Sequence, residues 1–508
     1  MFSLAQTFLS RFLRAPEHSS TISEQMPSTT STKTVVVLGA SYGGYTAAQH
    51  LAEQLPNGWR VIAIDRNSHF NHVYVFPRFT VLPGHSHKGF ITYNNRLGNP
   101  EGESRHILLN ASVTNLGANT VTLSRSFPEL GIVGEEPTLA FDYAIYALGS
   151  DMPGPINVWG PALDEENVSE GVSAEAVAGE ADAQPWAGPP LSEVTTATQP
   201  KQLKAVPMQG IGSKAAGVEW QKRAQKYIEK APSVLVVGGG ALGIQFATDI
   251  ADIYPDKTVT LLHSRERLLP RFHEAMHTEI VAALSSLNVN TILGDRLDLS
   301  YPDRTERDNH GVVEHVVRTV SGREIRAAII LLCTGQRPNS DFVKSIIPDS
   351  VISDGSTKGL IRVNHAMQIG VPAKPAPQDS ADDFPVGQSQ AGDDAFDIPY
   401  PHLFAVGDVA DTFGAVNAGY TAFAQALVAA NNILKLIQAE ETSSPTAPEL
   451  EQYQVQPPGI KMSIGRHKSL FQIGTEVGTK SDCPDDLEVV IMWNFLLKRQ
   501  VTEEEMYE

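Results

Sequence analysis

Cysteine is nearly absent from this chain. Only Cys333 and Cys483 occur among its 508 residues, so the sequence offers neither a disulfide framework nor a Cys-x-x-Cys or Cys-x4-Cys redox pair. Two pairs of histidines lie close together, at positions 85 and 87 and at 69 and 72, but neither has a carboxylate or thiol at ligand spacing. We therefore expect no metal site and no chemistry through an internal dithiol.

Positive charge is also scarce. Lys and Arg number 39 against 58 Asp and Glu, a net charge of −19, which argues against nucleic acid because a phosphate backbone requires a broad basic face. Residues 161–200 carry −8 and residues 371–397 carry −5, both amid many small and polar residues. Such segments bury too little apolar surface to offset the entropy of ordering them. We interpret both as solvated insertions, with an acidic docking surface as the alternative.

Long hydrophobic runs are missing as well. No stretch of 18 apolar residues occurs, so we expect no membrane-spanning helix. The first 14 residues are nevertheless basic and amphipathic, and a Ser- and Thr-rich stretch follows them up to Thr34. This arrangement is typical of a mitochondrial transit peptide or of an anchor at a membrane surface. We predict a mitochondrial protein with peripheral membrane contact, and the alternative is a cytoplasmic protein with a frayed terminus.

A first nucleotide-binding fold occupies residues 33–65. It contains, in order, the apolar run Val35–Leu38, the turn Gly39-Ala40-Ser41-Tyr42-Gly43-Gly44, a helical stretch to Leu55, and the strand Arg60–Ile64 followed by Asp65. The turn offers backbone N–H groups to a pyrophosphate, and Asp65 is placed to accept both hydrogen bonds from an adenosine ribose. Ser41 replaces the usual middle glycine, so a turn that binds no nucleotide is the alternative.

A second unit of the same design occupies residues 233–263. Its parts are the strand Val234–Val237, the turn Gly238-Gly239-Gly240-Ala241-Leu242-Gly243, the helix Ile244–Ile253 and the strand Thr258–Leu262. The acid at the end of the second strand is replaced by His263-Ser264-Arg265. Without a carboxylate to repel it, a 2′-phosphate can be held by Ser264 and Arg265, so we expect NADPH to be accepted. Ordinary surface polarity is the alternative for these residues.

Two later segments fit the same scheme. The short strand Ile329–Leu332 precedes a turn that contains Gly335 and can close over the second nucleotide. The strand Leu403–Val406 ends in Gly407-Asp408, ahead of a long helical stretch from Ala418 to Leu436. An aspartate at such a junction can accept a hydrogen bond from a ribityl hydroxyl, and the helix N-terminus can face a flavin or its phosphate.

The order of these motifs resembles the two-dinucleotide-binding flavoproteins, in which an NAD(P)H domain interrupts an FAD domain. Within them it is most similar to the apoptosis-inducing factor-like, ferroptosis-suppressor-type oxidoreductases. The likeness runs from about Lys33 into the C-terminal region and leaves out the two acidic segments. Its most specific motifs are Val234-Leu-Val-Val-Gly-Gly-Gly-Ala-Leu-Gly-Ile-Gln, Val259-Thr-Leu-Leu-His-Ser-Arg, Leu332-Cys-Thr-Gly and Phe404-Ala-Val-Gly-Asp-Val-Ala-Asp.

The resemblance implies two sets of binding residues. Contacts to FAD are implied at Gly39, Ala40, Ser41, Gly43, Gly44, Asp65, Arg78, Val113 and Asp408. The NAD(P)H site is implied at Gly238, Gly240, Gly243, Gln245, Ser264, Arg265 and Gly335. For Arg78, a guanidinium on FAD phosphate or adenine is the expected role, and a surface ion pair is the alternative. Relatives usually carry Glu where this chain has Gln245, whose amide can still bind the nicotinamide end but brings no charge.

The resemblance further implies an FAD-dependent oxidoreductase that passes a hydride from NAD(P)H to FAD and electrons on to a quinone-type acceptor. Because the cofactors carry this chemistry, no catalytic side chain is predicted. Two other functions remain open: a redox-controlled interaction protein with slow turnover, and a flavoenzyme of a biosynthetic pathway.

The predicted fold class is α/β, with two Rossmann-like domains and a smaller C-terminal α+β domain. The expected boundaries are a targeting or anchor segment at 1–32, the first part of the FAD domain at 33–150, an acidic insertion at 151–205, the NAD(P)H domain at 206–333, the second part of the FAD domain at 334–436, and the C-terminal domain at 437–508.

Overall fold

The computed structural model describes residues 32–93, 97, 104–151, 212–301, 304–307, 309, 311–334, 336–373 and 396–508. The amphipathic segment at 1–31, nearly all of both acidic segments, and Gly335 lie outside the described residues. The predictions made for them stay predictions.

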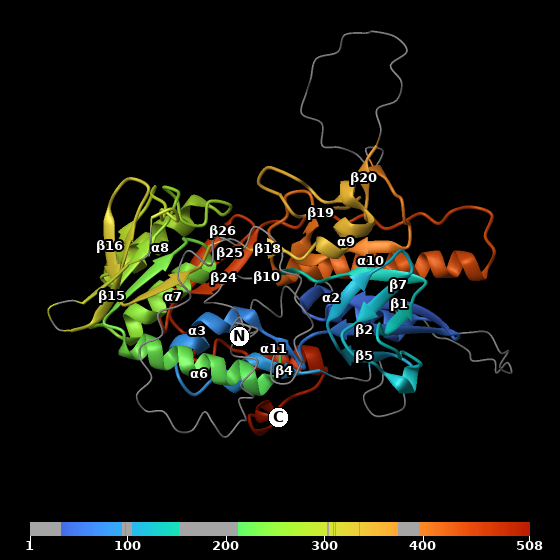
Figure 1. The fold of residues 1–508 in the computed structure, drawn as a ribbon, viewed down its shortest axis with the longest axis horizontal. Coiled ribbons are helices and arrows are strands. Elements are labelled where there is room, and N and C mark those ends of the chain that lie inside the picture. The colour runs from blue at the N-terminus through green and yellow to red at the C-terminus, as the bar shows by residue number, and fades with distance from the viewer. Residues whose placement is uncertain are drawn as a thin grey trace, which may run out of the picture. The chain divides into compact units, whose positions relative to one another are not determined.

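The first sheet is parallel throughout and has the order β22-β9-β1-β2-β5. Its strands are β1 (Lys33–Leu38), β2 (Trp59–Asp65), β5 (Ile107–Asn110), β9 (Tyr143–Tyr146) and β22 (Leu403–Ala405). All of β1 after its first residue is buried, as expected for a strand that is covered on both faces. Helices α2 (Tyr42–Gln54) and α10 (Gly419–Glu441) pack against each other beside this sheet (Figure 1).

The second sheet is also parallel, with the order β13-β12-β11-β17. It consists of β11 (Ser233–Val237), β12 (Thr258–Leu262), β13 (Asn290–Ile292) and β17 (Ile329–Leu332), accompanied by α7 (Ala241–Ile253) and α8 (Glu274–Ser286). Three antiparallel strands, β14 (Arg304–Arg307), β15 (Val313–Arg318) and β16 (Glu324–Ala327), precede β17. Because β22 returns to the first sheet after this domain, one Rossmann-like domain is inserted in the other, which confirms the predicted fold class.

A group of short elements connects β2 to β5 and lies against the second domain. It runs through β3 (His69–Asn71), η1 (Val73–Val75), α3 (Phe76–Val81), η2 (Ser86–Gly89) and β4 (Phe90–Thr92). Helix α3 contacts both α7 and α6 (Lys214–Lys230) (Figure 1). Gln225 of α6 donates from Nε2 to the Phe79 carbonyl at 2.5 Å, which ties the two helices together.

The C-terminal part is a three-stranded antiparallel sheet with a short helix. The strands are β24 (Gly459–Ser463), β25 (Ser469–Ile473) and β26 (Glu476–Lys480), and they are followed by α11 (Val490–Leu497) and η8 (Glu504–Tyr507). Strand β24 packs on α7, and β25 packs on α8. The predicted α+β character of this region is confirmed.

The remaining elements are small. They are the antiparallel strands β6 (Val113–Leu116), β7 (Thr120–Leu123) and β8 (Thr138–Ala140), the strand pairs β10 (Ser150–Asp151) with β18 (Arg337–Pro338), β19 (Ile361–Arg362) with β23 (Ala410–Asp411) and β20 (Val371–Pro372) with β21 (Phe396–Asp397), helix α9 (Asp341–Ile346), and the 3₁₀ turns η3 (Pro128–Leu130), η5 (Pro348–Ser350) and η7 (Gly407–Val409).

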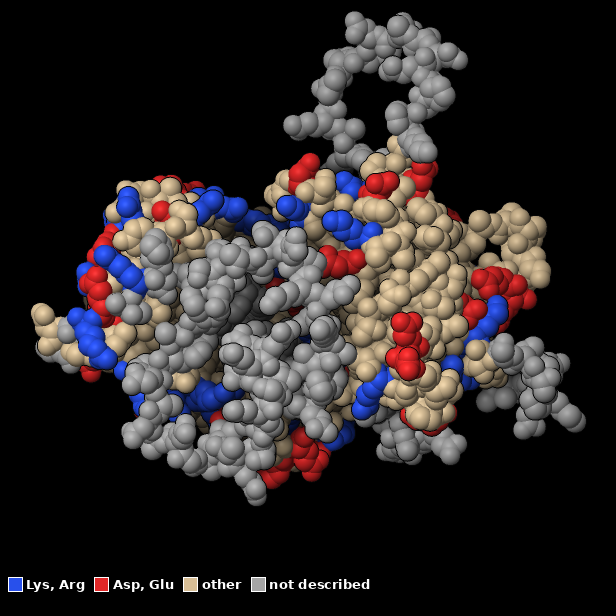
Figure 2. All heavy atoms as spheres, in the orientation of Figure 1, with Lys and Arg blue, Asp and Glu red and all other residues tan. Residues whose placement is uncertain are grey.

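Charge is mixed on the surface that Figure 2 shows. Among the described residues on that face, acidic and basic side chains are interspersed and form no broad basic area. No helix in the part of the chain that the structure describes has the length and apolarity needed to cross a membrane.

Candidate functional site

The turn between β1 and α2 forms a cradle of backbone groups. Gly39 has a φ of +91°, and a methyl group on Gly44 would overlap the Gly39 carbonyl oxygen. Both positions therefore require glycine, which lets the first turn of α2 pack against the end of β1. Ser41 is the N-cap of α2 and makes no side-chain capping bond, so its hydroxyl stays available. This arrangement fits a dinucleotide pyrophosphate at the N-terminus of α2.

Asp65 ends β2 beside this cradle. Its carboxylate accepts hydrogen bonds from the backbone N–H of Ala40 at 2.6 Å and from the backbone and side chain of Asn67 at 2.7 and 2.9 Å. Burial raises the pKa of Asp65. Since a carboxylate has about four acceptor sites and the protein uses three, one site remains for a ribose hydroxyl, not the two that the sequence suggested.

Val113 lies shortly after β5, the strand that pairs with β2 and ends beside Asp65. It is the half-buried first residue of β6, where the pairing with β7 shifts register. Asn110, at the end of β5, donates from its side chain to the Asp65 carbonyl at 3.1 Å. The structure thus brings the cradle, Asp65 and the start of β6 to the same end of the first sheet.

Asp408 lies in η7, just after β22 of the same sheet. The residue is half-buried, and burial raises the pKa of its carboxyl to about 6. Within the described residues, no hydrogen bond reaches its carboxylate. The neighbouring Gly407, with a φ of +79°, donates its N–H to Gln425 of α10 at 2.7 Å. A partner-free carboxylate near the start of a long helix fits the ribityl-binding role expected of Asp408.

Three aromatic side chains gather close to Asp408. The Tyr42 hydroxyl and His72 Nδ1 are 2.9 Å apart, and the Tyr74 hydroxyl accepts the Gly419 N–H, at the first residue of α10, at 2.7 Å. The two tyrosine rings meet edge to face at 5.4 Å. Burial lowers the pKa of His72 to about 3, so the ring is neutral.

Sequence reasoning missed this cluster. Tyr42 sits within the glycine-rich turn, and His72 and Tyr74 sit in the aromatic stretch ahead of Arg78. That stretch was the only available signal, because the pairing joins residues 30 positions apart and no local pattern encodes it.

The turn between β11 and α7 repeats the first cradle. Gly238 has a φ of +124°, and a methyl group on Gly243 would overlap the Gly238 carbonyl oxygen. Gly240, the N-cap of α7, faces open space. The second glycine of such a turn must let a pyrophosphate approach closely, and the free volume at Gly240 meets that requirement.

His263 directly follows β12 and forms a hydrogen bond with this turn. Its Nδ1 accepts the Gly239 N–H at 3.0 Å, so the ring proton is on Nε2, which lies 3.2 Å from the Arg267 carbonyl. Burial lowers the pKa of His263, which favours this neutral form. Ser264 and Arg265 are exposed, and within the described residues their side chains make no hydrogen bond or ion pair. Both are free to meet a phosphate.

Gln245 lies one turn into α7. Its side chain is buried and donates from Nε2 to the Ser463 hydroxyl of β24 at 3.2 Å. The amide therefore joins α7 to the C-terminal sheet, and a contact with the nicotinamide end stays a prediction.

Arg78 is placed differently from what the sequence suggested. Its guanidinium donates to both oxygens of Asp249, at 2.9 Å each, and to the carbonyls of Gly465 and Arg466. Neither side chain of the pair is exposed. The expected contact with FAD phosphate or adenine is therefore replaced by an ion pair, and this pair is buried, whereas the alternative placed it on the surface. The sequence could not reveal Asp249 as the partner, because it lies 171 residues away.

Replacing Asp408 by alanine should reduce FAD occupancy. The carboxylate would offer a charged acceptor to a ribityl hydroxyl, and such bonds contribute roughly 1.5–3 kcal/mol, so we expect FAD to bind about 10- to 100-fold more weakly. The flavin-to-protein absorbance ratio after gel filtration measures this, with Asp354→Ala on an exposed loop as the control. NADPH binding should change little. Normal flavin content in the Asp408→Ala variant would contradict the assignment.

Several known proteins have sequences similar to that of this chain. Residues 33–376 match a family described as pyridine nucleotide-disulphide oxidoreductase. Fe-regulated protein 8 of Mycosarcoma maydis is 35% identical over 464 residues, covering 91% of this chain and 94% of that protein. Ferroptosis suppressor protein 1 of Taeniopygia guttata is 25% identical over 342 residues, covering 66% and 70%.

A solved structure supports the fold. An engineered water-forming NADPH oxidase bound to NADPH superposes with a TM-score of 0.51 at 14% identity, covering 86% of this chain and 74% of that one. The resemblance to ferroptosis-suppressor-type proteins that the sequence indicated is confirmed by these matches.

Proposed function

Because this chain belongs to the pyridine nucleotide-disulphide oxidoreductase family and is an NAD(P)H-dependent flavoprotein oxidoreductase, we propose that its electrons leave through a quinone-type acceptor. FAD and NAD(P)H, its cofactors, supply hydride transfer and electron storage when bound. The residues of the chain itself would bind and orient these groups: the two glycine cradles would hold the pyrophosphates, Asp65 and Asp408 would accept from hydroxyls, and the N-terminus of α10 would favour the negative charge of the flavin phosphates.

The chain's cysteines do not suit disulfide reduction. Cys333 is half-buried and Cys483 is buried, and burial raises the pKa of each thiol. A thiol held in its neutral form is a poor nucleophile, and the two residues lie 150 positions apart in the sequence, outside any dithiol motif. We therefore propose a small diffusible acceptor in place of a disulfide.

A row of aromatic rings is the observation that carries the quinone proposal. From Tyr42, beside Asp408, the row continues to Phe423 of α10 at 5.9 Å and on to Phe495 of α11 at 5.6 Å. Helix α11 is almost entirely apolar, yet most of its side chains are only half-buried. Planar apolar rings favour stacking on aromatic side chains. The row thus supports a path for a quinone ring from α11 to the flavin side of the site.

Steady-state oxidation of NADPH with a panel of acceptors tests this proposal. We expect fast turnover with a short-chain ubiquinone and slow turnover with glutathione disulfide or molecular oxygen. Phe495→Ala should raise the KM for the quinone and leave flavin reduction by NADPH unchanged, whereas Tyr400→Ala, which changes an aromatic residue outside the row, should alter neither. No turnover with any quinone would contradict the proposal.

Arg265 should select NADPH over NADH. A guanidinium on the 2′-phosphate forms a charge-assisted bond of roughly 1.5–3 kcal/mol, so Arg265→Ala should raise the KM for NADPH about 10- to 100-fold and that for NADH hardly at all. The matched control is Arg304→Ala, an exposed arginine on β14 of the same domain. Equal changes for the two nucleotides would show that Arg265 does not read the 2′-phosphate.

We also propose that residues 1–32 direct the protein to mitochondria or to a membrane surface. Their basic, amphipathic pattern supports this. A fluorescent protein fused behind this segment should collect on mitochondria or membranes. Diffuse cytoplasmic fluorescence would favour the frayed-terminus alternative.

A further inference from the structure

One short stretch of chain contacts the starts of two helices in the FAD domain and the nucleotide-binding helix of the other domain. We call residues His72–Arg78 the bridging segment. His72 binds the hydroxyl of Tyr42, the first residue of α2, and Tyr74 accepts from the N–H of Gly419, the first residue of α10. Four residues later, Arg78 pairs with Asp249 of α7. The segment thus connects the two flavin-side helix starts to the helix that follows the second cradle.

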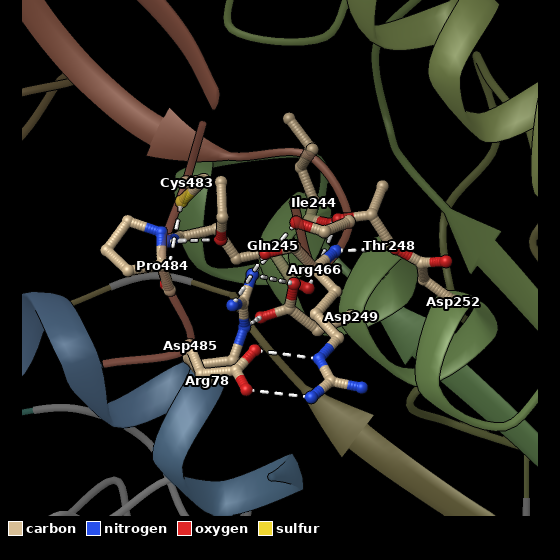
Figure 3. A network of polar contacts seen from close by, with 12 residues as sticks. Arg78, Ile244, Gln245, Thr248, Asp249, Asp252, Arg466, Cys483, Pro484 and Asp485 are labelled. Carbon is tan, nitrogen blue, oxygen red and sulfur yellow. Dashed lines mark hydrogen bonds and ion pairs between the residues drawn. The ribbon is translucent and has the colours of Figure 1, made fainter. Parts of the chain in front are cut away.

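The Arg78 guanidinium makes four hydrogen bonds where the bridging segment contacts α7. Arg78 binds Asp249 through a bidentate fork, Nε to Oδ2 and Nη2 to Oδ1, both at 2.9 Å. The same guanidinium donates to the Gly465 carbonyl at 2.8 Å and to the Arg466 carbonyl at 3.0 Å. Figure 3 shows Arg78 on α3, Asp249 on α7 and Arg466, in the turn between β24 and β25, meeting at this point. A planar fork with four bonds fixes the relative orientation of its partners.

The face of α7 that receives Arg78 carries polar side chains, and all of them except the exposed Asp252 are buried. Gln245 binds Ser463 and the Asp252 carboxylate accepts the Arg466 N–H at 2.6 Å, so two positions on this face are held by the turn from Ser463 to Arg466. Thr248 and Asp249 between them are fully buried. Hydrogen bonds of this kind depend on direction, whereas apolar packing tolerates sliding. These contacts therefore fix the rotation of α7 about its axis and its position along that axis. They also fix the position of the second cradle, which lies at the N-terminus of α7.

Stability alone is a poor explanation for a buried ion pair. Removing two charges from water offsets most of their attraction, and well-packed apolar residues often replace such pairs without loss of stability. Hydride transfer, in contrast, depends steeply on the distance between donor and acceptor, so that a shift of about 1 Å can cost 100-fold in rate.

We propose that the bridging segment positions the nicotinamide-binding helix relative to the flavin, with the Arg78–Asp249 pair as the contact that fixes the distance for hydride transfer. Both residues are positioning residues, since neither touches a cofactor through its charged group. The proposal rests on the hydride transfer of the family and is independent of the final acceptor.

The test replaces the pair by apolar residues of similar size. The double variant Arg78→Met/Asp249→Leu removes both charges together and so leaves no unpaired charge behind. It should fold, retain FAD and bind NADPH with nearly unchanged affinity. Anaerobic stopped-flow mixing with saturating NADPH should show a limiting rate of flavin reduction that is lowered about 10- to 100-fold. The long-wavelength charge-transfer band of stacked nicotinamide and flavin should weaken.

A second variant keeps the shape of the side chain, and a control removes an exposed ion pair. Asp249→Asn leaves the Arg78 guanidinium without a charged partner, so its melting temperature is measured beside the limiting rate, for which we expect an intermediate fall. The matched control is Arg326→Met/Glu324→Leu, which removes an exposed pair in the same domain and should leave the rate unchanged. A limiting rate equal to that of the wild type in both Arg78–Asp249 pair variants would overturn the proposal. Failure of the wild-type flavin to be reduced would instead contradict the family function.

Discussion

Replacing Gly243 by alanine should leave FAD bound but abolish its reduction by NAD(P)H. The added methyl group would overlap the Gly238 carbonyl oxygen and crowd Cys333. The turn between β11 and α7 therefore has to widen to accommodate it. Since Gly238 already sits at a φ of +124° that other residues rarely adopt, the turn has little freedom to adjust. A displaced cradle moves the nicotinamide from its reacting position, and we expect the rate of flavin reduction to fall by more than about 100-fold.

Two measurements separate this effect from general unfolding. The visible spectrum and melting temperature report the FAD domain, and anaerobic stopped-flow reduction reports the NAD(P)H site. Gly355→Ala is the matched control, because this glycine has a positive φ of +75° and open space around it on an exposed loop. A Gly243→Ala variant that is reduced at the wild-type rate would show that the second cradle does not bind NAD(P)H.

Gly44→Ala should have the opposite pattern and yield a protein without flavin. The methyl group would overlap the Gly39 carbonyl oxygen and approach the side chain of Ala147 to 3.2 Å, which prevents the first turn of α2 from closing. Because α2 packs against α10 over the first sheet, the free energy of unfolding should also fall. We expect the flavin-to-protein absorbance ratio after purification to be close to zero.

As a control, the Gly44→Ala variant should still bind NADPH at the second cradle. Quenching of NADPH fluorescence should still titrate with this variant, because the second cradle belongs to a different sheet. A normal flavin-to-protein ratio in Gly44→Ala would be incompatible with FAD in the first cradle. Together, the two glycine variants distinguish a protein with two nucleotide sites from one with a single site.

The sequence predicted those parts of the site that are encoded locally. Both cradles were identified because a βαβ turn needs glycine at fixed spacing, and the structure places Gly39, Gly44, Gly238 and Gly243 where a side chain would collide with the chain's own backbone. The strands and helices around them also follow from short apolar runs. The long helix extends to Glu441, beyond its predicted end at Leu436.

The sequence could not predict contacts between distant segments. Arg78 was assigned to FAD through the resemblance to the flavoprotein family, but its partner Asp249 lies 171 residues away on α7 and is buried in the fold. His263 was noted only as the replacement for an acid, and its bond to Gly239 became apparent with the geometry. In each case the decisive fact is which segments pack together, and no local pattern encodes that.

Anaerobic mixing of the FAD-loaded protein with stereospecifically deuterated NADPH is the most direct test of the central claim. If the two cradles hold flavin and nicotinamide within reach of each other, the flavin absorbance should disappear in a single turnover, more slowly when deuterium occupies one particular face of the nicotinamide. Flavin that stays oxidised at saturating NADPH and NADH, although both nucleotides bind, would contradict the account.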